Sequence, residues 1–291
     1  QICVARFQPE STPALLARHG VTQAAAGTAF HQAYLAAQRA HGEDALFPRV
    51  RCFPGGGAPK PPQLHFDIKR EMGGAGIVSG YGLTECPTCS MNRVTDGDEK
   101  LAHREGRANP ADLRIRIVKS DDSVAGPGDE GEVRVRGPQL FQGYLDPALG
   151  REAFDDQGFF RTGDLGTLDA DGFLAITGRL KDVIVRKGEN ISAKEVEDLL
   201  HEHPKVTEAA AIGLPDPETG ERCCAVVVST EEDAPLEFNE MVSFLREKGL
   251  TPQKLPEQLE SIDSLPRNAT GKVLKHELRR RFEPARGRSG A

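Results

Sequence analysis

The hydrophobic pattern of this chain changes near Asp112, and this change constrains the fold more than any other feature. Before it, segments with helical periodicity alternate with short apolar strands; we expect helices at 11–20, 29–39 and 62–71 and strands at 50–53 and 76–79. Alternating helices and strands favour a parallel sheet. After it, residues 113–118 and 131–136 alternate apolar and polar side chains between turns rich in Gly, Pro and Asp. That pattern predicts an antiparallel, barrel-like subdomain.

A second change follows a predicted hairpin, whose strands at 166–168 and 173–177 are joined by a turn containing Asp171-Gly172. Residues 178–182 are the expected domain boundary. Beyond it we expect short mixed elements: strands at 183–186, 206–212 and 223–229, and helices at 193–201, 239–248 and 273–282. A chain of 291 residues suits one large and one smaller domain. The prediction is an α/β domain at 1–178, a mobile α+β domain at 179–284 and a disordered tail at 285–291.

Charge and composition exclude several classes of function. Lys and Arg total 37 against 44 Asp and Glu, a net charge of −7, so nothing attracts nucleic acid or anionic lipid in general. No stretch approaches the roughly 20 apolar residues of a membrane span, and the first residues lack a signal-peptide pattern. We expect a cytoplasmic protein. Cys86 and Cys89 form a C-x-x-C without a second pair, which argues against structural zinc, and Cys223 and Cys224 are expected to pack in a core.

Four groups of residues carry a resemblance to a known family. They are 55–59 with 81–85, then 161–165, then 178–195, then 266–272. In this order and spacing they resemble the adenylate-forming (AMP-binding) superfamily, which includes acyl-CoA synthetases, luciferases and the adenylation domains of peptide synthetases. The resemblance covers about residues 1–282. It implies activation of a carboxylic acid by ATP as an acyl-adenylate, followed by transfer to the thiol of CoA.

Activating an acid with ATP brings a carboxylate to a phosphate while pyrophosphate leaves, so cations and preorganised donors must stabilise the transition state. The resemblance implies that Thr84 donates to the α-phosphate and that Glu85 binds Mg²⁺, which prefers oxygen ligands. It also implies that Tyr81 stacks on the adenine beside Gly82. The loop that packs against the base consists of Gly55, Gly56, Gly57, Ala58 and Pro59. Taken alone, the segment 81–85 would suit a strand-to-helix turn in which Thr84 is the N-cap of the helix.

Three further residues complete the adenylate site that the resemblance implies. Asp164, expected in a turn before a strand, and Arg179 would bind the ribose hydroxyls. Lys272, in a Pro- and Gly-bounded loop before the last helix, would contact the substrate carboxylate and phosphate oxygens. Taken singly, these residues would suit a surface turn, a solvated arginine and a loop lysine.

The resemblance also implies a rotation of the small domain between the two half-reactions, with Lys181 at the hinge. Lys187, Gly188 and Glu189 would face the pantetheine of CoA, and the run Lys-Gly-Glu-Asn-Ile resembles acyl-CoA synthetases more than domains that load carrier proteins. The alternative is a β-turn whose glycine serves backbone geometry only. The expected cofactors are therefore ATP, Mg²⁺ and CoA.

The chain departs from the family in one respect, because it has no Ser/Thr/Gly-rich loop ending in Lys to bind the outer phosphates. We therefore expect an N-terminally truncated chain with little adenylation activity of its own. The acid pocket is expected at 55–57, 79–82 and Cys86, for a medium-chain, alicyclic or aromatic acid. Two alternatives stay open: an enzyme that loads a carrier-protein phosphopantetheine, and a non-catalytic AMP-binding module. The oligomeric state cannot be read from the sequence.

Overall fold

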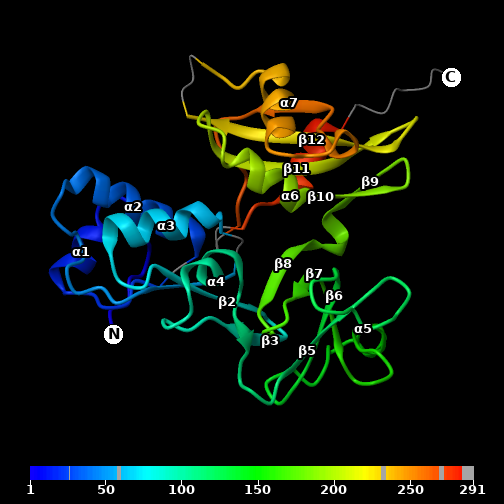
Figure 1. The fold of residues 1–291 in the computed structure, drawn as a ribbon, viewed down its shortest axis with the longest axis horizontal. Coiled ribbons are helices and arrows are strands. Elements are labelled where there is room, and N and C mark those ends of the chain that lie inside the picture. The colour runs from blue at the N-terminus through cyan, green and yellow to red at the C-terminus, as the bar shows by residue number, and fades with distance from the viewer. Residues whose placement is uncertain (26, 58–59, 231–233, 269–271, 284–291) are drawn as a thin grey trace. The chain divides into compact units, whose positions relative to one another are not determined.

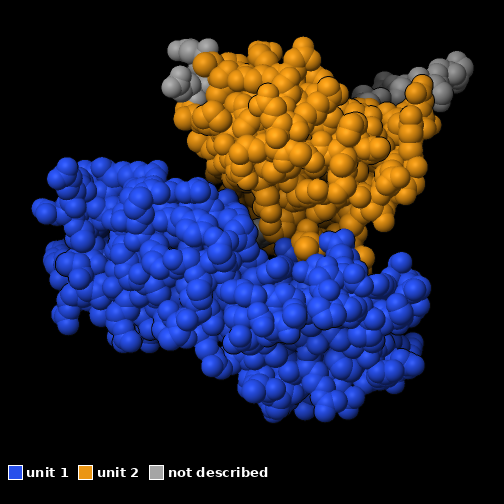
Figure 2. Space-filling view, in the orientation of Figure 1, with its two compact units in different colours: residues 1–176 blue, residues 177–291 orange. Residues whose placement is uncertain are grey.

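The computed structural model describes residues 1–25, 27–57, 60–230, 234–268 and 272–283. The chain divides into two compact units, Gln1–Ile176 and Thr177–Ala291, which Figure 2 colours blue and orange. Each unit is described by itself. The predicted disordered tail falls outside the described residues. Within the described residues, no helix is long and apolar enough to span a membrane.

The first sheet of unit 1 has the order β1-β2-β3-β4, and Figure 1 labels its strands β2 and β3. Strand β1 (Phe53–Gly55) runs parallel to β2 (Ile77–Leu83), as the helix–strand alternation predicted. Strands β3 (Cys86–Met91) and β4 (Arg107–Ala108) continue the sheet in antiparallel fashion, which the sequence pattern did not predict. The sheet is therefore mixed, and only its β1–β2 half is parallel.

Helices of unit 1 supply the apolar surface that covers β1 and β2. They are α1 (Thr12–Arg18), α2 (Thr28–His41), α3 (Pro62–Met72) and α4 (Asp98–His103). Helix α3 begins at a proline, which suits the first helical turn, and its buried side chains include Ile68. Ile68 packs with Tyr34 of α2, with Phe53 of β1 and with Ile77 of β2 in one core cluster. This packing holds the carboxyl ends of β1 and β2 at one edge.

The second sheet of unit 1 is antiparallel, with the order β5-β6-β7-β8. It consists of β5 (Arg114–Val118), β6 (Gly131–Arg136), β7 (Phe160–Leu168) and β8 (Leu174–Arg179). The short helix α5 (Pro147–Ala153) lies in the connection between β6 and β7. Ile117, Val133 and Leu174 share one buried cluster with Cys86 and Cys89 of β3, so the two sheets of unit 1 share a core. The predicted α/β architecture with an antiparallel subdomain is confirmed.

Unit 2 is an α+β unit built on a sheet of order β10-β9-β12-β11, with β13 paired in parallel to β12. Its strands are β9 (Val183–Arg186), β10 (Glu189–Ser192), β11 (Val206–Asp216), β12 (Gly220–Ser229) and β13 (Gln258–Ser261). Its helices are α6 (Ala193–Leu200), α7 (Phe238–Glu247) and α8 (Lys275–Phe282), with short 3-10 turns η1 (Leu180–Asp182) and η2 (Pro252–Lys254).

Cys223 and Cys224 lie side by side in β12 but belong to different cores. Because successive side chains of a strand point to opposite faces, Cys223 packs in the cluster that includes Val196 of α6, and Cys224 packs in the cluster that includes Leu278 of α8. Burial raises the pKa of each thiol to about 12. Both cysteines therefore act as small apolar side chains in packing.

Candidate functional site

The pairing of β1 with β2 brings the two glycine-containing segments together. Gly55 is the register partner of Ser79, so the residues after β1 follow the same sheet edge as the end of β2. The backbones approach so closely that a methyl group on Gly56 would lie 2.9 Å from the carbonyl oxygen of Gly80. Gly57 follows in the left-handed region, while Ala58 and Pro59 lie outside the described residues. Carboxyl ends of parallel strands are the usual place for ligands in open α/β sheets.

Tyr81, near the end of β2, contacts Asp164 of β7. The tyrosine hydroxyl donates to Oδ2 of the carboxylate across 2.6 Å, although 83 positions separate the two residues in sequence. Burial first, and then the negative charge of Asp164, raise the pKa of Tyr81, which keeps its hydroxyl neutral as a donor. Asp164 is 8% exposed. This contact joins two of the four sequence segments across the two sheets of unit 1.

Asp164 does not lie in a turn before a strand, as the sequence predicted, but inside β7 at an irregularity. Glu132 of β6 pairs with Leu165, and Arg134 pairs with Arg161. A single β6 residue between these pairs therefore faces three β7 residues, which is a bulge. Gly163 sits there with φ of 69°. The bulge interrupts the alternation of side chains along β7 next to Asp164. For this reason the sequence Thr-Gly-Asp predicts a turn.

Thr84 and Glu85 form the two-residue turn between β2 and β3, because Leu83 pairs directly with Cys86. A strand follows this turn, so the N-cap alternative is wrong. The hydroxyl of Tyr144 donates to Oε1 of Glu85 across 2.6 Å, and this bond raises the pKa of Tyr144 to about 12. Thr84 is exposed. Sequence reasoning missed Tyr144, which lies in an irregular connection where neither hydrophobic period predicts a contact.

No group of three or more His, Cys, Asp or Glu side chains that could hold a metal ion occurs among the residues that the structure describes. Cys86 and Cys89 are fully buried free thiols, and the Cys89 thiol donates to the carbonyl oxygen of Cys86 at 3.4 Å. Burial raises the pKa of both thiols, which suits packing beside Tyr81.

The remaining candidate residues belong to unit 2. Arg179 is the last residue of β8 and precedes η1, which contains Lys181. Lys187 and Gly188 are the turn between β9 and β10, since Arg186 pairs with Glu189. Their φ angles are 51° and 83°, so the β-turn alternative describes this backbone correctly.

Lys272 is exposed in a loop that precedes α8. Its backbone N–H donates to Oδ1 of Asn268 at 2.9 Å, and the Asn268 N–H donates back to the carbonyl oxygen of Lys272 at 3.0 Å. This reciprocal pair fixes the backbone from which the lysine side chain extends. Thr84, Glu85 and Asp164 are thus positioned by unit 1, while Arg179 and Lys272 are positioned by unit 2.

Comparisons with known proteins cover most of the chain. The family model described as AMP-binding enzyme matches residues 1–145, and the one described as AMP-binding enzyme C-terminal domain matches 195–272. The medium-chain fatty-acid–CoA ligase of Escherichia coli is 38% identical over 79% of this chain and 40% of its own length. The salicyl-AMP ligase / salicyl-S-ArCP synthetase of Mycobacterium tuberculosis is 38% identical over 96% of this chain and 48% of its own length.

Solved structures agree with these matches. ATP-bound MatB from Rhodopseudomonas palustris superposes with a TM-score of 0.88 at 30% identity, over 97% of this chain and 55% of that one. MenE from Bacillus subtilis, an o-succinylbenzoate CoA synthetase in complex with ATP and magnesium ion, gives a TM-score of 0.79 at 31% identity, over 94% and 54%. The chain spans about half the length of the curated relatives it matches. It belongs to the AMP-binding enzyme family, whose two family models it matches in sequence order.

Proposed function

We propose that this protein activates a carboxylic acid with ATP as an acyl-adenylate and transfers the acyl group to the thiol of CoA. The observation that carries the proposal is the contact between Tyr81 and Asp164, beside the glycine loop at the carboxyl ends of β1 and β2. An aromatic ring and a carboxylate at such an edge suit a nucleoside, with the base against the ring and the ribose hydroxyls on the carboxylate.

Each residue then has a defined role in adenylation. Asp164 and Arg179 bind the ribose, and Thr84 donates its hydroxyl to the α-phosphate. Lys272 brings a positive charge to the substrate carboxylate and the phosphate oxygens, where charge develops in the transition state. Mg²⁺ bound by Glu85 would neutralise phosphate charge. The turn geometry of Glu85 and the oxygen chemistry of its carboxylate fit that ion, and Tyr144 orients the carboxylate through Oε1.

Transfer to a thiol requires the bulky acceptor to enter the same site, so we propose a small domain at 179–284 that rotates about Lys181 against a large domain at 1–178. Lys187, Gly188 and Glu189 would then line the path of the pantetheine. The tight turn supports this assignment, because Gly188 at its tip has no side chain to obstruct the chain of the pantetheine. Replacing Lys181 with Pro should slow thioester formation far more than adenylation in single-turnover assays.

A carrier-protein phosphopantetheine is the second candidate acceptor. It is favoured by relatives such as the salicyl-AMP ligase / salicyl-S-ArCP synthetase, which is as similar to this chain as the fatty-acid–CoA ligase is. A competition assay with free CoA and a phosphopantetheinylated carrier protein separates the two. The substrate we propose is a medium-chain, alicyclic or aromatic acid; the names of the two relatives support the medium-chain and the aromatic class.

The test of the whole proposal is ATP–pyrophosphate exchange with a panel of such acids. It should be run on the 291 residues and on a chain extended by the reading frame ahead of Gln1, since the loop for the outer phosphates is absent from this sequence. We expect robust exchange by the extended chain only. Lys272→Ala should lower the exchange rate about 100-fold or more, and Lys254→Ala, which removes a surface ion pair with Glu195, should not. AMP binding without exchange in either chain would instead identify a non-catalytic module.

A further inference from the structure

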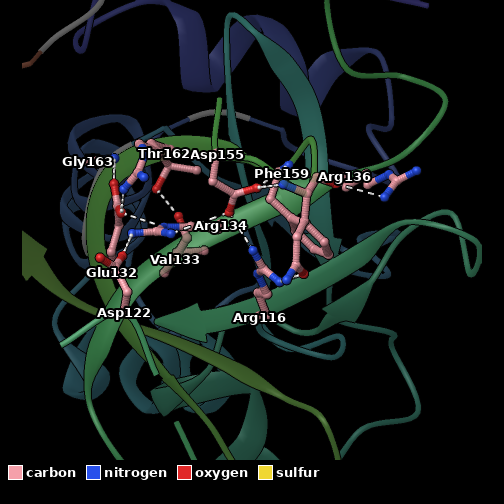
Figure 3. Close-up of polar contacts among 12 residues, drawn as sticks. Arg116, Asp122, Glu132, Val133, Arg134, Arg136, Asp155, Phe159, Thr162 and Gly163 are labelled. Atoms are coloured by element: carbon pink, nitrogen blue, oxygen red, sulfur yellow. Dashed lines mark hydrogen bonds and ion pairs between the residues drawn. The ribbon is translucent and has the colours of Figure 1, made fainter. Parts of the chain in front are cut away.

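A buried cluster of charges lies in the second sheet of unit 1, next to Thr162 and Gly163 of the bulge (Figure 3). In it, Nε of Arg134 donates to Oε2 of Glu132 at 2.8 Å, and Nη1 of Arg134 donates to Oδ2 of Asp155 at 3.3 Å. Arg116 also donates to Asp155. The side chains of Arg134, Glu132 and Asp155 are 7%, 10% and 2% exposed. We call Arg116, Glu132, Arg134 and Asp155 the β6 cluster.

The β6 cluster is internally well satisfied. Oδ1 of Asp155 accepts the backbone N–H groups of Gln157 and Phe159 at 3.0 and 2.9 Å. Burial works against the charge of Asp155, yet the Phe159 amide and Arg116 hold its pKa below the usual value. Buried ion pairs nevertheless give little net stability compared with well-packed apolar side chains. Stability alone therefore does not explain why the β6 cluster is charged. The hydrogen bonds that its side chains make with the backbone suggest another role.

One of those contacts reaches the bulge itself. The backbone N–H of Gly163 donates to Oε1 of Glu132 at 3.3 Å. Gly163 lies where the β6–β7 register shifts, and the Glu132 carboxylate accepts its N–H on the β6 side in place of a β6 carbonyl. The hydroxyl of Thr162 donates to the carbonyl oxygen of Val133 at 2.6 Å and accepts the N–H of Asp164 at 3.1 Å. The bulge is thus held on both sides of Gly163.

We infer that Glu132 is a positioning residue for the ribose-binding carboxylate: its Oε1 holds the Gly163 amide, and Arg134 with Asp155 aligns Glu132 for that contact. This inference rests on the proposed function of Asp164. The length of the side chain at position 132 matters more than its charge, because the acceptor oxygen must extend as far as the Gly163 N–H. Without it the bulge loses its acceptor, and the carboxylate of Asp164 spreads over several orientations.

The experiment separates reach from charge. Glu132→Gln keeps the length and one acceptor oxygen for Gly163 but gives up the acceptor for Nε of Arg134, whereas Glu132→Asp keeps the charge and both oxygens but falls short of Gly163. AMP and its dideoxyribose counterpart are titrated calorimetrically against each variant, and the ratio of their dissociation constants measures ribose recognition. We expect a ratio of at least about 10 for the unaltered protein and for Glu132→Gln, and a ratio near one for Glu132→Asp and for Asp164→Ala. Asp122→Asn, which removes the charge of another partner of Arg134 and keeps an acceptor oxygen, should leave the ratio unchanged.

Two outcomes would overturn the inference while leaving the proposed function intact: a ratio kept by Glu132→Asp but lost by Glu132→Gln, or a ratio kept by both. A ratio near one in the unaltered protein would instead remove the ribose site from the proposed function. Amide hydrogen exchange at Gly163 without nucleotide then decides the positioning role by itself. Exchange that is faster in Glu132→Asp than in Glu132→Gln supports the role, and equal exchange contradicts it.

Discussion

The hydroxyl of Tyr81 donates to Oδ2 of Asp164 across 2.6 Å, and the hydroxyl of Tyr144 donates to Oε1 of Glu85 across the same distance. The two bonds differ in their surroundings. Asp164 is buried, while Tyr144 is 39% exposed. A hydrogen bond to a charged group contributes more to stability when water cannot replace the donor. The two tyrosines therefore form a matched pair for measuring what burial adds.

Removing the Tyr81 hydroxyl should cost more stability than removing the Tyr144 hydroxyl. Tyr81→Phe removes one hydrogen-bond donor from a buried carboxylate, so we expect the free energy of unfolding to fall by about 1–3 kcal/mol. Tyr144→Phe should lower it by about 0.5 kcal/mol or less, because water reaches Glu85. Urea denaturation followed by circular dichroism measures both. Equal losses would contradict a contribution of burial to the Tyr81–Asp164 bond.

His31 should make the protein less stable in mild acid. Burial lowers the pKa of this histidine from 6.5 to about 4. Between these values the unfolded chain binds a proton that the folded chain does not, so the free energy of unfolding falls as pH drops from about 6.5 and levels off below about 4. At 1.36 kcal/mol for each pKa unit the contribution is roughly 3 kcal/mol.

The measurement is the pH dependence of urea unfolding in His31→Leu compared with the unaltered protein. The variant should lack this part of the acid loss, so the two curves should converge as pH falls. His41→Gln, an exposed histidine at the end of the same helix, is the control and should follow the unaltered protein. Parallel curves for all three would show that His31 is not held neutral in the folded protein.

Breaking the β6 cluster at Asp155 should be strongly destabilising. Asp155→Ala removes the buried carboxylate that Arg116 and Arg134 share. We expect the free energy of unfolding to fall by about 3–5 kcal/mol. Asp129→Ala removes the partner of Lys119 in a surface pair and should cost under about 1 kcal/mol. The difference between the two urea midpoints checks this. Comparable losses would contradict burial as the cause.

The turn at Lys187 and Gly188 should respond to backbone conformation. Both residues have positive φ, so Gly188→Ala should lower the free energy of unfolding by about 1 kcal/mol. Lys187→Asn should be neutral or stabilising by a few tenths of a kcal/mol, because asparagine tolerates this region better than lysine. Chemical denaturation of the two variants reports the difference. A Gly188→Ala variant as stable as the unaltered protein would argue against this turn geometry.

Local patterns were sufficient to predict much of the fold. The alternation at 131–136 and the short strand predicted at 183–186 match β6 and β9, with the bounds that the structure has. The Pro-started periodic segment at 62–71 predicted α3 to within a residue. Periodicity works for α3 because the helix buries one face. Strand β6 buries both of its faces, since its polar side chains Glu132 and Arg134 are enclosed as well, and the sequence pattern did not predict this. Strands β3 and β13 were not predicted, because their polar or proline-containing sequences show no apolar periodicity.

The sequence by itself determined which residue types are available for an adenylate: the glycine loop, Tyr81, Thr84, Glu85, Asp164 and Lys272, in a recognisable order. Only the tertiary structure decided that Tyr81 meets Asp164, that Tyr144 meets Glu85 and that Asp164 lies on a bulge held by Glu132. The physical reason is that these contacts depend on strand register between segments far apart in the chain. A shift of one position would turn each side chain to the other face, and no local pattern records that choice.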